Sequence, residues 1–241
     1  MNLPFLTQHT RRWNWIAAVS IAITLGMIFW YAPTERMMGH VQRIFYFHVG
    51  SAWVASITLF VALVCGALYL RRPHPTWDAL SLASVEIGVV LFSMTIVSGS
   101  IWGRPAWNTW WEWSPRLTSA TIMWLVYVAY LMLRAAVDDE DKKRRFAAVY
   151  VIAAFVTTLI TYGSIRILRD IHPVMFGGTL ETAQGQEQGL QDFQGLAAAE
   201  MGITLTVACI AFMLLYVAWV ANRLRLQQME NEVAQLKASL R

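Results

Sequence analysis

Six long apolar runs, each about the length needed to cross a bilayer as a helix, constrain this chain more than any other feature of its sequence. The hydrocarbon core of a membrane takes about 20 consecutive apolar residues. The runs are continuous, whereas a β-barrel needs alternating apolar and polar residues. Charged residues make up only 14% of the 241 residues, too few to cover a soluble fold of this size. The sequence therefore predicts an all-α integral membrane protein with six transmembrane helices, at about 13–31, 44–70, 79–101, 117–137, 146–165 and 195–221.

Lysine and arginine are distributed unevenly over the connections between these runs. An even number of spans places both termini on one side of the membrane, and the segments on that side hold thirteen of the 19 Lys and Arg residues. The positive-inside rule therefore predicts that both termini are cytoplasmic. We treat residues 1–221 as one transmembrane domain and 222–241 as a cytoplasmic amphipathic tail. The tail carries apolar residues at 3-4-3-4 spacing, and we expect it to dock on the membrane surface or on a cytoplasmic partner: Leu226, Met229, Val233, Leu236 and Leu240.

Five of the 12 tryptophans fall within residues 102–113. Tryptophans near span ends are explained by the aromatic belt of membrane proteins, but a belt does not require five in one loop that also contains Gly103 and Pro105. The alternative is a flat aromatic surface for a large planar apolar ligand, because indole faces offer a broad contact area. We expect this loop, residues 102–116, to lie on the outer side of the membrane. Its tryptophans are Trp102, Trp107, Trp110, Trp111 and Trp113.

Two histidines from distant segments are expected on the same outer side, His48 near the start of the second span and His172 in the third outer loop. A single histidine near a helix end is usually a hydrogen-bonded structural residue. A pair beside an aromatic loop favours an iron porphyrin, because imidazole is a common axial ligand of haem iron. The propionates would need basic partners, for which Arg43 and Arg116 are candidates. His40, in the first outer loop, remains an alternative to His172.

Several function classes are excluded or not indicated. The two cysteines are too few for a disulfide framework and do not form the CxxCH pair of covalent c-type haem attachment. The chain has no phosphate-binding loop of the GxxxxGK[ST] type. A net charge of +4 gives no indication of a nucleic-acid partner. Glu86, roughly 10 Å inside the third span at 1.5 Å per residue, is either functional or structural, and the sequence leaves both open.

The string WGRPAWNTWWEWSPRLTS, preceded by VSGSI, resembles the tryptophan-rich WWD signature of haem-handling membrane proteins. Together with YFHVGSAW and the six spans, it resembles the CcmC family, haem exporter protein C of cytochrome c maturation, from about residue 13 to 221. The resemblance implies that His48 and His172 are the two axial ligands of the haem iron, and that the tryptophan loop is the haem-binding surface. At the position of the signature's aspartate this chain has Ser114, with Glu112 two residues upstream.

The resemblance also implies a role and a location. The protein would bind haem b transiently as cargo, on the periplasmic side of the bacterial inner membrane, and present it to the haem chaperone CcmE. Its partners would be the ABC-type subunits CcmA and CcmB and the small protein CcmD, with ATP hydrolysis only in the partner. The chain would then be a non-enzymatic delivery subunit. Two alternatives remain, a component of a cytochrome c haem lyase and a translocator that moves haem across the bilayer.

Overall fold

The computed structural model describes residues 4–36, 38–167 and 198–240, and within these ranges the chain is helical with no strands. Short turns of π-helix and 3₁₀-helix, η1 and η2, flank the connection between the first two spans. The prediction of an all-α fold is confirmed. The elements in chain order are α1 (Pro4–Gln8), α2 (Thr10–Gly26), η1 (Met27–Tyr31), η2 (His40–Gln42), α3 (Arg43–Arg71), α4 (Pro75–Trp107), α5 (Pro115–Ala136), α6 (Glu140–Ile167) and α8 (Ala199–Ser239).

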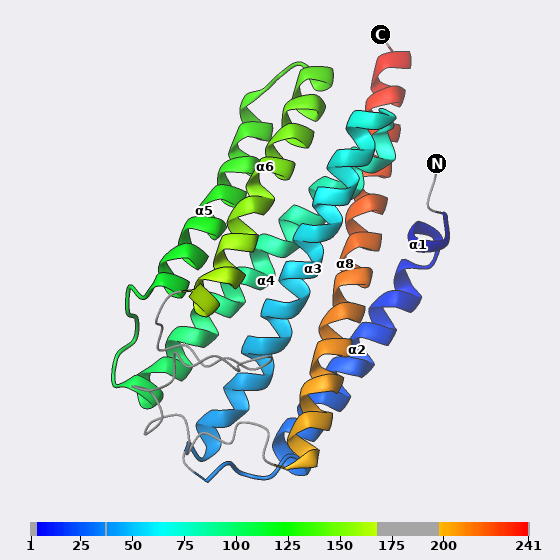
Figure 1. Ribbon diagram of the computed structural model, residues 1–241. Helices are drawn as coiled ribbons and strands as arrows, with labels where there is room; N and C mark the ends of the chain where they lie inside the picture. The colour runs from blue at the N-terminus through cyan, green and yellow to red at the C-terminus, as the bar shows by residue number, and fades with distance from the viewer. Residues whose placement is uncertain (1–3, 37, 168–197, 241) are drawn as a thin grey trace.

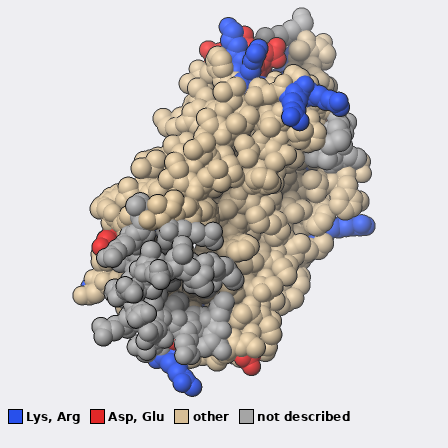
Figure 2. All heavy atoms as spheres, viewed as in Figure 1, with Lys and Arg blue, Asp and Glu red and all other residues tan. Residues whose placement is uncertain are grey.

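Six helices are long and apolar enough to cross a membrane, as predicted. Large apolar side chains remain exposed on the flanks of the bundle, which is expected where lipid replaces water. On the face drawn in Figure 2, most charged side chains lie near the two ends, with a broad uncharged surface between them. The helices extend beyond several predicted spans. In particular, α4 continues to Trp107, past the predicted end at residue 101.

The helices form one bundle with α3 and α4 at its centre (Figure 1). The α5–α6 pair packs on one side, where α6 contacts α3, and the α2–α8 pair packs on the other. Small residues permit close approach, as is usual between membrane helices. A Cβ atom on Gly66 of α3, for example, would lie 2.6 Å from Cγ1 of Val151 on α6. Both termini lie at the same end of the bundle, which we call the inner end; the opposite end is the outer end.

A buried ion pair closes the inner end of the bundle. Asp78 in the first turn of α4 accepts two hydrogen bonds from Arg134 near the end of α5, at 2.5 and 2.9 Å. Both side chains are less than 10% exposed, and Nε of Arg144 on α6 lies 3.8 Å from the same carboxylate. Because a buried charge is costly without a partner, this contact fixes the relative positions of α4, α5 and α6.

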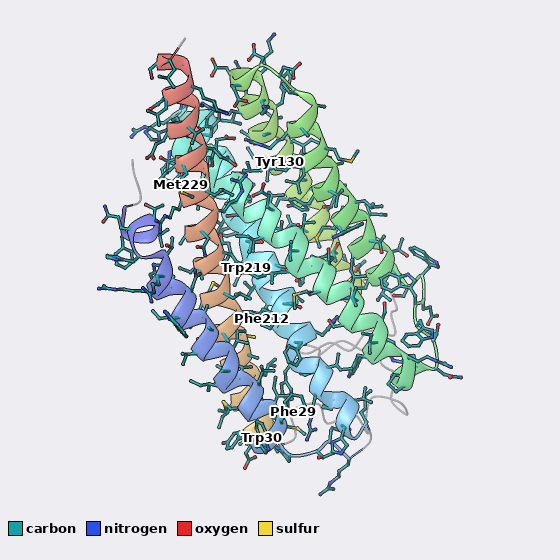
Figure 3. The ribbon with its side chains drawn as sticks, turned by 180° about the vertical axis from the view of Figure 1, so that it is seen from behind. Phe29, Trp30, Tyr130, Phe212, Trp219 and Met229 are labelled. Atoms are coloured by element: carbon teal, nitrogen blue, oxygen red, sulfur yellow. The ribbon has the colours of Figure 1, made fainter. Side chains whose placement is uncertain are left out.

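The predicted tail is a straight continuation of α8 and not a separate element. Its five apolar residues are all at least 45% exposed. Figure 3 shows Met229 on the part of α8 toward the inner end, whereas Phe29 and Trp30 lie at the outer end. The tail continues along the axis of the membrane-spanning helix, and its apolar side chains are exposed. The expected docking on a surface or partner stays a prediction.

Candidate functional site

A pocket of about 330 Å³ lies between α3, α4, α5 and α6 at the outer end of the bundle. Its volume is within the range of about 300–1,000 Å³ that is usual for small-molecule sites. The lining is mainly aromatic and aliphatic, with a few polar groups. The residues that line it are Phe45, His48, Val49, Ala52, Trp53, Phe92, Thr95, Ile96, Gly99, Ser100, Trp102, Gly103, Trp107, Thr109, Trp110, Trp111, Glu112, Arg116, Leu117, Ala120, Thr161 and Tyr162.

The first two tryptophans of the cluster lie in a helix, which corrects the prediction that residues 102–116 form one irregular loop. Helix α4 continues through Pro105 and ends at Asn108, which adopts the left-handed conformation (φ 56°, ψ 20°). Asparagine tolerates this conformation better than most residues. The guanidinium of Arg104 donates hydrogen bonds of 2.5 Å to the backbone and side-chain oxygens of Asn108. The loop is therefore only Asn108–Ser114, and the last turns of α4 form a rigid wall of the pocket.

Trp102 and Trp107 form that wall together. Their rings meet edge to face at 5.3 Å between centroids, with an angle of 89°. Trp102 is 6% exposed, and it also lies near Phe45 of α3, whose ring centroid is 6.4 Å away. This packing ties the end of α4 to the start of α3. The indole faces are consequently held in fixed positions before any ligand arrives.

The remaining three tryptophans belong to the loop and differ in position. Trp110 lines the pocket and is 60% exposed. Trp111 also lines it, and its buried Nε1 has no hydrogen-bond partner among the described residues. Trp113 is 70% exposed, lies outside the lining and packs edge to face on Trp111 at 5.8 Å. Four of the five predicted tryptophans thus line one cavity, and the fifth, Trp113, packs on the outside of Trp111.

His48 reaches the pocket from the second turn of α3. Its Nδ1 lies 2.9 Å from the backbone oxygen of Thr95 on α4. A carbonyl oxygen can only accept, so Nδ1 carries a proton, and the neutral ring has its lone pair on Nε2. The Oγ of Ser98 is a longer contact of Nδ1, at 3.4 Å. The imidazole is therefore held in the tautomer that can ligate a metal through Nε2.

The two candidate arginines do not meet at the site. Arg116, in the first turn of α5, lines the pocket; its Nη1 donates to the backbone oxygen of Thr161 at 3.2 Å and its guanidinium lies 5.2 Å from the ring centre of Tyr162. Arg43 is not part of the lining. Its guanidinium stacks on Phe29 at 5.2 Å and its Nη2 is 3.4 Å from the backbone oxygen of that residue. Of the two candidates, Arg116 is therefore the one at the pocket.

Of the histidines predicted on the outer side, the described structure places only His48 at the pocket. His40 belongs to η2, is exposed and does not line the pocket. His172, the predicted second axial ligand, lies outside the described residues. The described part of the chain thus brings only His48 of the two predicted ligands to the cavity.

Ser114 has a clear local role. It is the N-cap residue of α5, and its hydroxyl accepts a hydrogen bond from the backbone N–H of Leu117 at 3.4 Å, with Pro115 in the first helical position. Serine and aspartate are both preferred at this position, because an oxygen acceptor satisfies an amide that has no partner within the helix. Ser114 therefore caps α5 without carrying a charge.

Sequence reasoning missed the floor of the pocket. Thr95, Gly99 and Gly103 all line the cavity, and their spacing of four residues places them on one face of α4. That spacing, in TIVSGSIWG, was the available signal. Tyr162 of α6 was also missed. No pattern pointed to it, because only the packing of α6 on α3 brings it to the cavity, where its hydroxyl is hydrogen-bonded to Ser56.

The arrangement suits a planar apolar molecule that carries a metal and acidic groups. Indole rings offer apolar walls, His48 offers an imidazole nitrogen for a metal, and Arg116 offers donors for a carboxylate. Among the described residues, no cluster of three or more His, Cys, Asp or Glu side chains could hold a bare metal ion. The pocket therefore fits a metal that arrives within an organic ring better than a bare cation.

Fold and site together define a class, that of polytopic membrane proteins with an aromatic, histidine-containing pocket at one end of the helix bundle. The sequence family described as "Heme exporter protein C" matches residues 3–239. The chain belongs to this family, which is CcmC.

Individual relatives extend over most of the chain. "Heme exporter protein C" of Paracoccus denitrificans is 29% identical over 227 residues, 93% of this chain and 89% of the relative. The protein of the same name from Bradyrhizobium diazoefficiens is 29% identical over 95% of this chain and 81% of its own length. The Escherichia coli K12 protein of that name is 32% identical over 66% of each chain.

Proposed function

We propose that this protein binds haem as cargo in the outer pocket and holds it for transfer to another protein during c-type cytochrome maturation. One observation carries the proposal: His48, with Nδ1 bonded to Thr95, lies in a cavity walled by four tryptophans. The relatives named for haem export support the identity of the cargo. In this proposal Nε2 of His48 is one axial ligand and His172 is the other.

The other groups of the pocket bind and orient the cargo. The faces of Trp102, Trp107, Trp110 and Trp111 contact the porphyrin, whereas Arg116 binds its propionates. Trp110 is 60% exposed, so one edge of the cargo would remain accessible from outside. An accessible edge is what transfer to a second protein requires. The chain itself forms no covalent bond to haem b and supplies no catalysis; it is a holder.

The acceptor in this proposal is the chaperone CcmE, with CcmA, CcmB and CcmD as further partners and ATP hydrolysis confined to the ABC-type subunits. The protein resides in the bacterial inner membrane with both termini cytoplasmic and the pocket on the periplasmic side. The orientation follows from the excess of Lys and Arg on the side of the termini. The family name supports the maturation system, and the cargo site supports the delivery role.

Presentation is preferred to translocation for a physical reason. Toward the inner end, the described helices are packed with a buried apolar cluster that includes Leu59, Leu91 and Tyr127. The Asp78–Arg134 pair lies still closer to the inner end, in the first turn of α4 and the last turn of α5. A porphyrin crossing the bilayer between α3, α4 and α5 would have to separate this core. A haem lyase would in addition need a site for an apocytochrome peptide with a CxxCH sequence, and reconstitution with such a peptide distinguishes that activity from delivery.

The test is a haem titration of the purified full-length protein in detergent, followed by visible absorption. The wild type, His48→Ala and His172→Ala are compared, with His74→Ala, a residue of the inner end, as the matched control. We expect His48→Ala and His172→Ala each to change the Soret band and to weaken binding by at least tenfold, and His74→Ala to match the wild type. If both site variants bind haem as the wild type does, the ligand assignment is wrong.

A further inference from the structure

We infer that Gly99 and Thr95 of α4 are positioning residues that set the orientation of the His48 imidazole, so that Nε2 is presented to the cargo before it binds. The inference deepens the proposed function and rests on it. It concerns how two residues of the pocket lining hold the histidine. Three observations support it. They are the hydrogen bond between His48 and the backbone of Thr95, the absence of a side chain at Gly99, and a buried hydrogen bond between the hydroxyls of Ser51 and Thr95.

The hydrogen bond fixes the rotation of the ring. Nδ1 of His48 lies 2.9 Å from the Thr95 oxygen, a backbone atom within the long helix α4 that cannot turn away. Imidazoles that bind metals usually donate their second N–H to a carbonyl or carboxylate in this way, which fixes both the tautomer and the direction of the lone pair. The ring is thus held from behind by α4, although it belongs to α3.

The missing side chain leaves room for the ring. A Cβ atom on Gly99 would lie 2.7 Å from Cε1 and 3.1 Å from Nδ1 of His48. A carbon–carbon contact of 2.7 Å is not tolerated, so the ring would have to shift from the position in which it is hydrogen-bonded to Thr95. Gly99 is one helical turn beyond Thr95, so the bond and the space come from the same face of α4. Even the smallest side chain at position 99 is therefore incompatible with the observed ring.

The hydroxyl bridge locks the two helices in register behind the ring. Oγ of Ser51 lies 3.1 Å from the backbone oxygen of His48, to which it can donate a hydrogen bond. It also lies 2.9 Å from Oγ1 of Thr95, and either of these two hydroxyls can be the donor. Ser51 is fully buried and Thr95 is 7% exposed. A polar bridge in this apolar setting resists sliding of α3 along α4, because separation would leave buried groups without partners. The position of the Thr95 oxygen relative to His48 is thereby fixed.

The decisive experiment is a double-mutant cycle on haem binding, measured by titration and by the visible spectrum of the bound iron. We expect Gly99→Ala to weaken haem binding by about 10–100-fold, as is usual when the residue that orients a metal ligand is lost, and to shift the spectrum as His48→Ala does. In the His48→Ala background, Gly99→Ala should have no further effect, because the ring that it displaces is gone.

The matched controls separate positioning from general damage. Gly202→Ala adds a methyl group to α8 where, its own helix backbone and chain neighbours apart, no atom of the described residues lies within 4 Å, and it should leave both affinity and spectrum unchanged. Ser51→Ala adds no volume and removes the bridge, so it should change the spectrum in the same direction even if Gly99→Ala fails to fold. A Gly99→Ala effect that persists in the His48→Ala background would overturn the inference, and so would wild-type spectra for both variants.

The outcomes also distinguish this inference from the proposed function. If His48→Ala changes haem binding while Gly99→Ala and Ser51→Ala do not, the histidine is a ligand and only the positioning role is wrong. If His48→Ala has no effect on haem binding, the proposed ligand itself is wrong.

Discussion

Arg223 of α8 donates two hydrogen bonds to Glu86 of α4, Nε to Oε2 at 2.6 Å and Nη2 to Oε1 at 3.2 Å. The two residues are 137 positions apart in the sequence. Both side chains are about 30% exposed, at 27% and 32%. The contact gives Glu86 a structural role, namely to join the last helix to the central pair near the inner end. The sequence alone did not reveal this partner of Glu86.

A first prediction concerns this pair. Glu86→Ala and Arg223→Ala should each lower the thermal midpoint of the purified protein, and the double variant should lose less than the sum of the two. We expect a coupling free energy on the order of 1 kcal/mol, because the pair is close but partly solvated. Haem binding should be unaffected, since the pair is remote from the outer pocket. Additive losses would show that the two side chains stabilise the fold independently.

A second prediction concerns the buried pair of Asp78 and Arg134. Removal of one partner leaves the other charge buried, which typically costs about 3–5 kcal/mol. Asp78→Ala should therefore destabilise the protein far more than Glu140→Ala, which removes surface ion pairs with Lys143 at 2.6 Å and Arg144 at 3.7 Å, each worth about 0.5 kcal/mol. Thermal unfolding in detergent measures both. Equal losses in the two variants would contradict the burial argument.

The tryptophans give a third prediction. Trp107→Ala removes part of the pocket wall, whereas Trp113→Ala removes a ring that is 70% exposed and outside the lining. We expect Trp107→Ala to weaken haem binding at least tenfold, about 1.4 kcal/mol, and Trp113→Ala by less than about threefold. Tryptophan fluorescence quenching by haem provides the affinities. A larger effect of Trp113→Ala would place the cargo on the outer surface of the loop.

A fourth prediction concerns Arg116 and Arg43. Arg116→Gln should weaken haem binding, because this cation lines the pocket, whereas Arg43→Gln should not, because Arg43 stacks on Phe29. The comparison is sharpened with a haem analogue whose propionates are esterified. The affinity of Arg116→Gln for the ester should equal that of the wild type, since neither carboxylate remains to be bound. A loss on Arg43→Gln alone would reverse the assignment.

A fifth prediction concerns the helix cap at Ser114. Ser114→Asp should be nearly neutral for stability, because aspartate caps a helix as well as serine does, whereas Ser114→Ala should cost about 1 kcal/mol. Thermal midpoints of the three proteins provide the ranking. If Ser114→Asp also leaves haem affinity unchanged, the carboxylate of the family signature serves as a helix cap. A gain in affinity would instead assign that carboxylate a role at the cargo.

The sequence by itself determined the class of fold, the six membrane spans and the region of the site. Each of these depends on local composition, since a run of about 20 apolar residues has no stable alternative to a membrane helix. Family membership likewise followed from a contiguous string of residues. His48, Arg116 and four of the tryptophans could be predicted as site residues because they stand in or beside such strings.

The tertiary structure decided the rest, because it depends on which helix faces which. Arg43 and Arg116 are equally plausible partners of a propionate in the sequence, and only the packing turns Arg43 toward Phe29. The pairing of Glu86 with Arg223 joins α4 to α8 and leaves no periodic signal. Gly99 acquires its importance only when His48 of another helix lies against it. Contacts between distant segments are set by side-chain geometry in three dimensions, and local sequence patterns do not encode them.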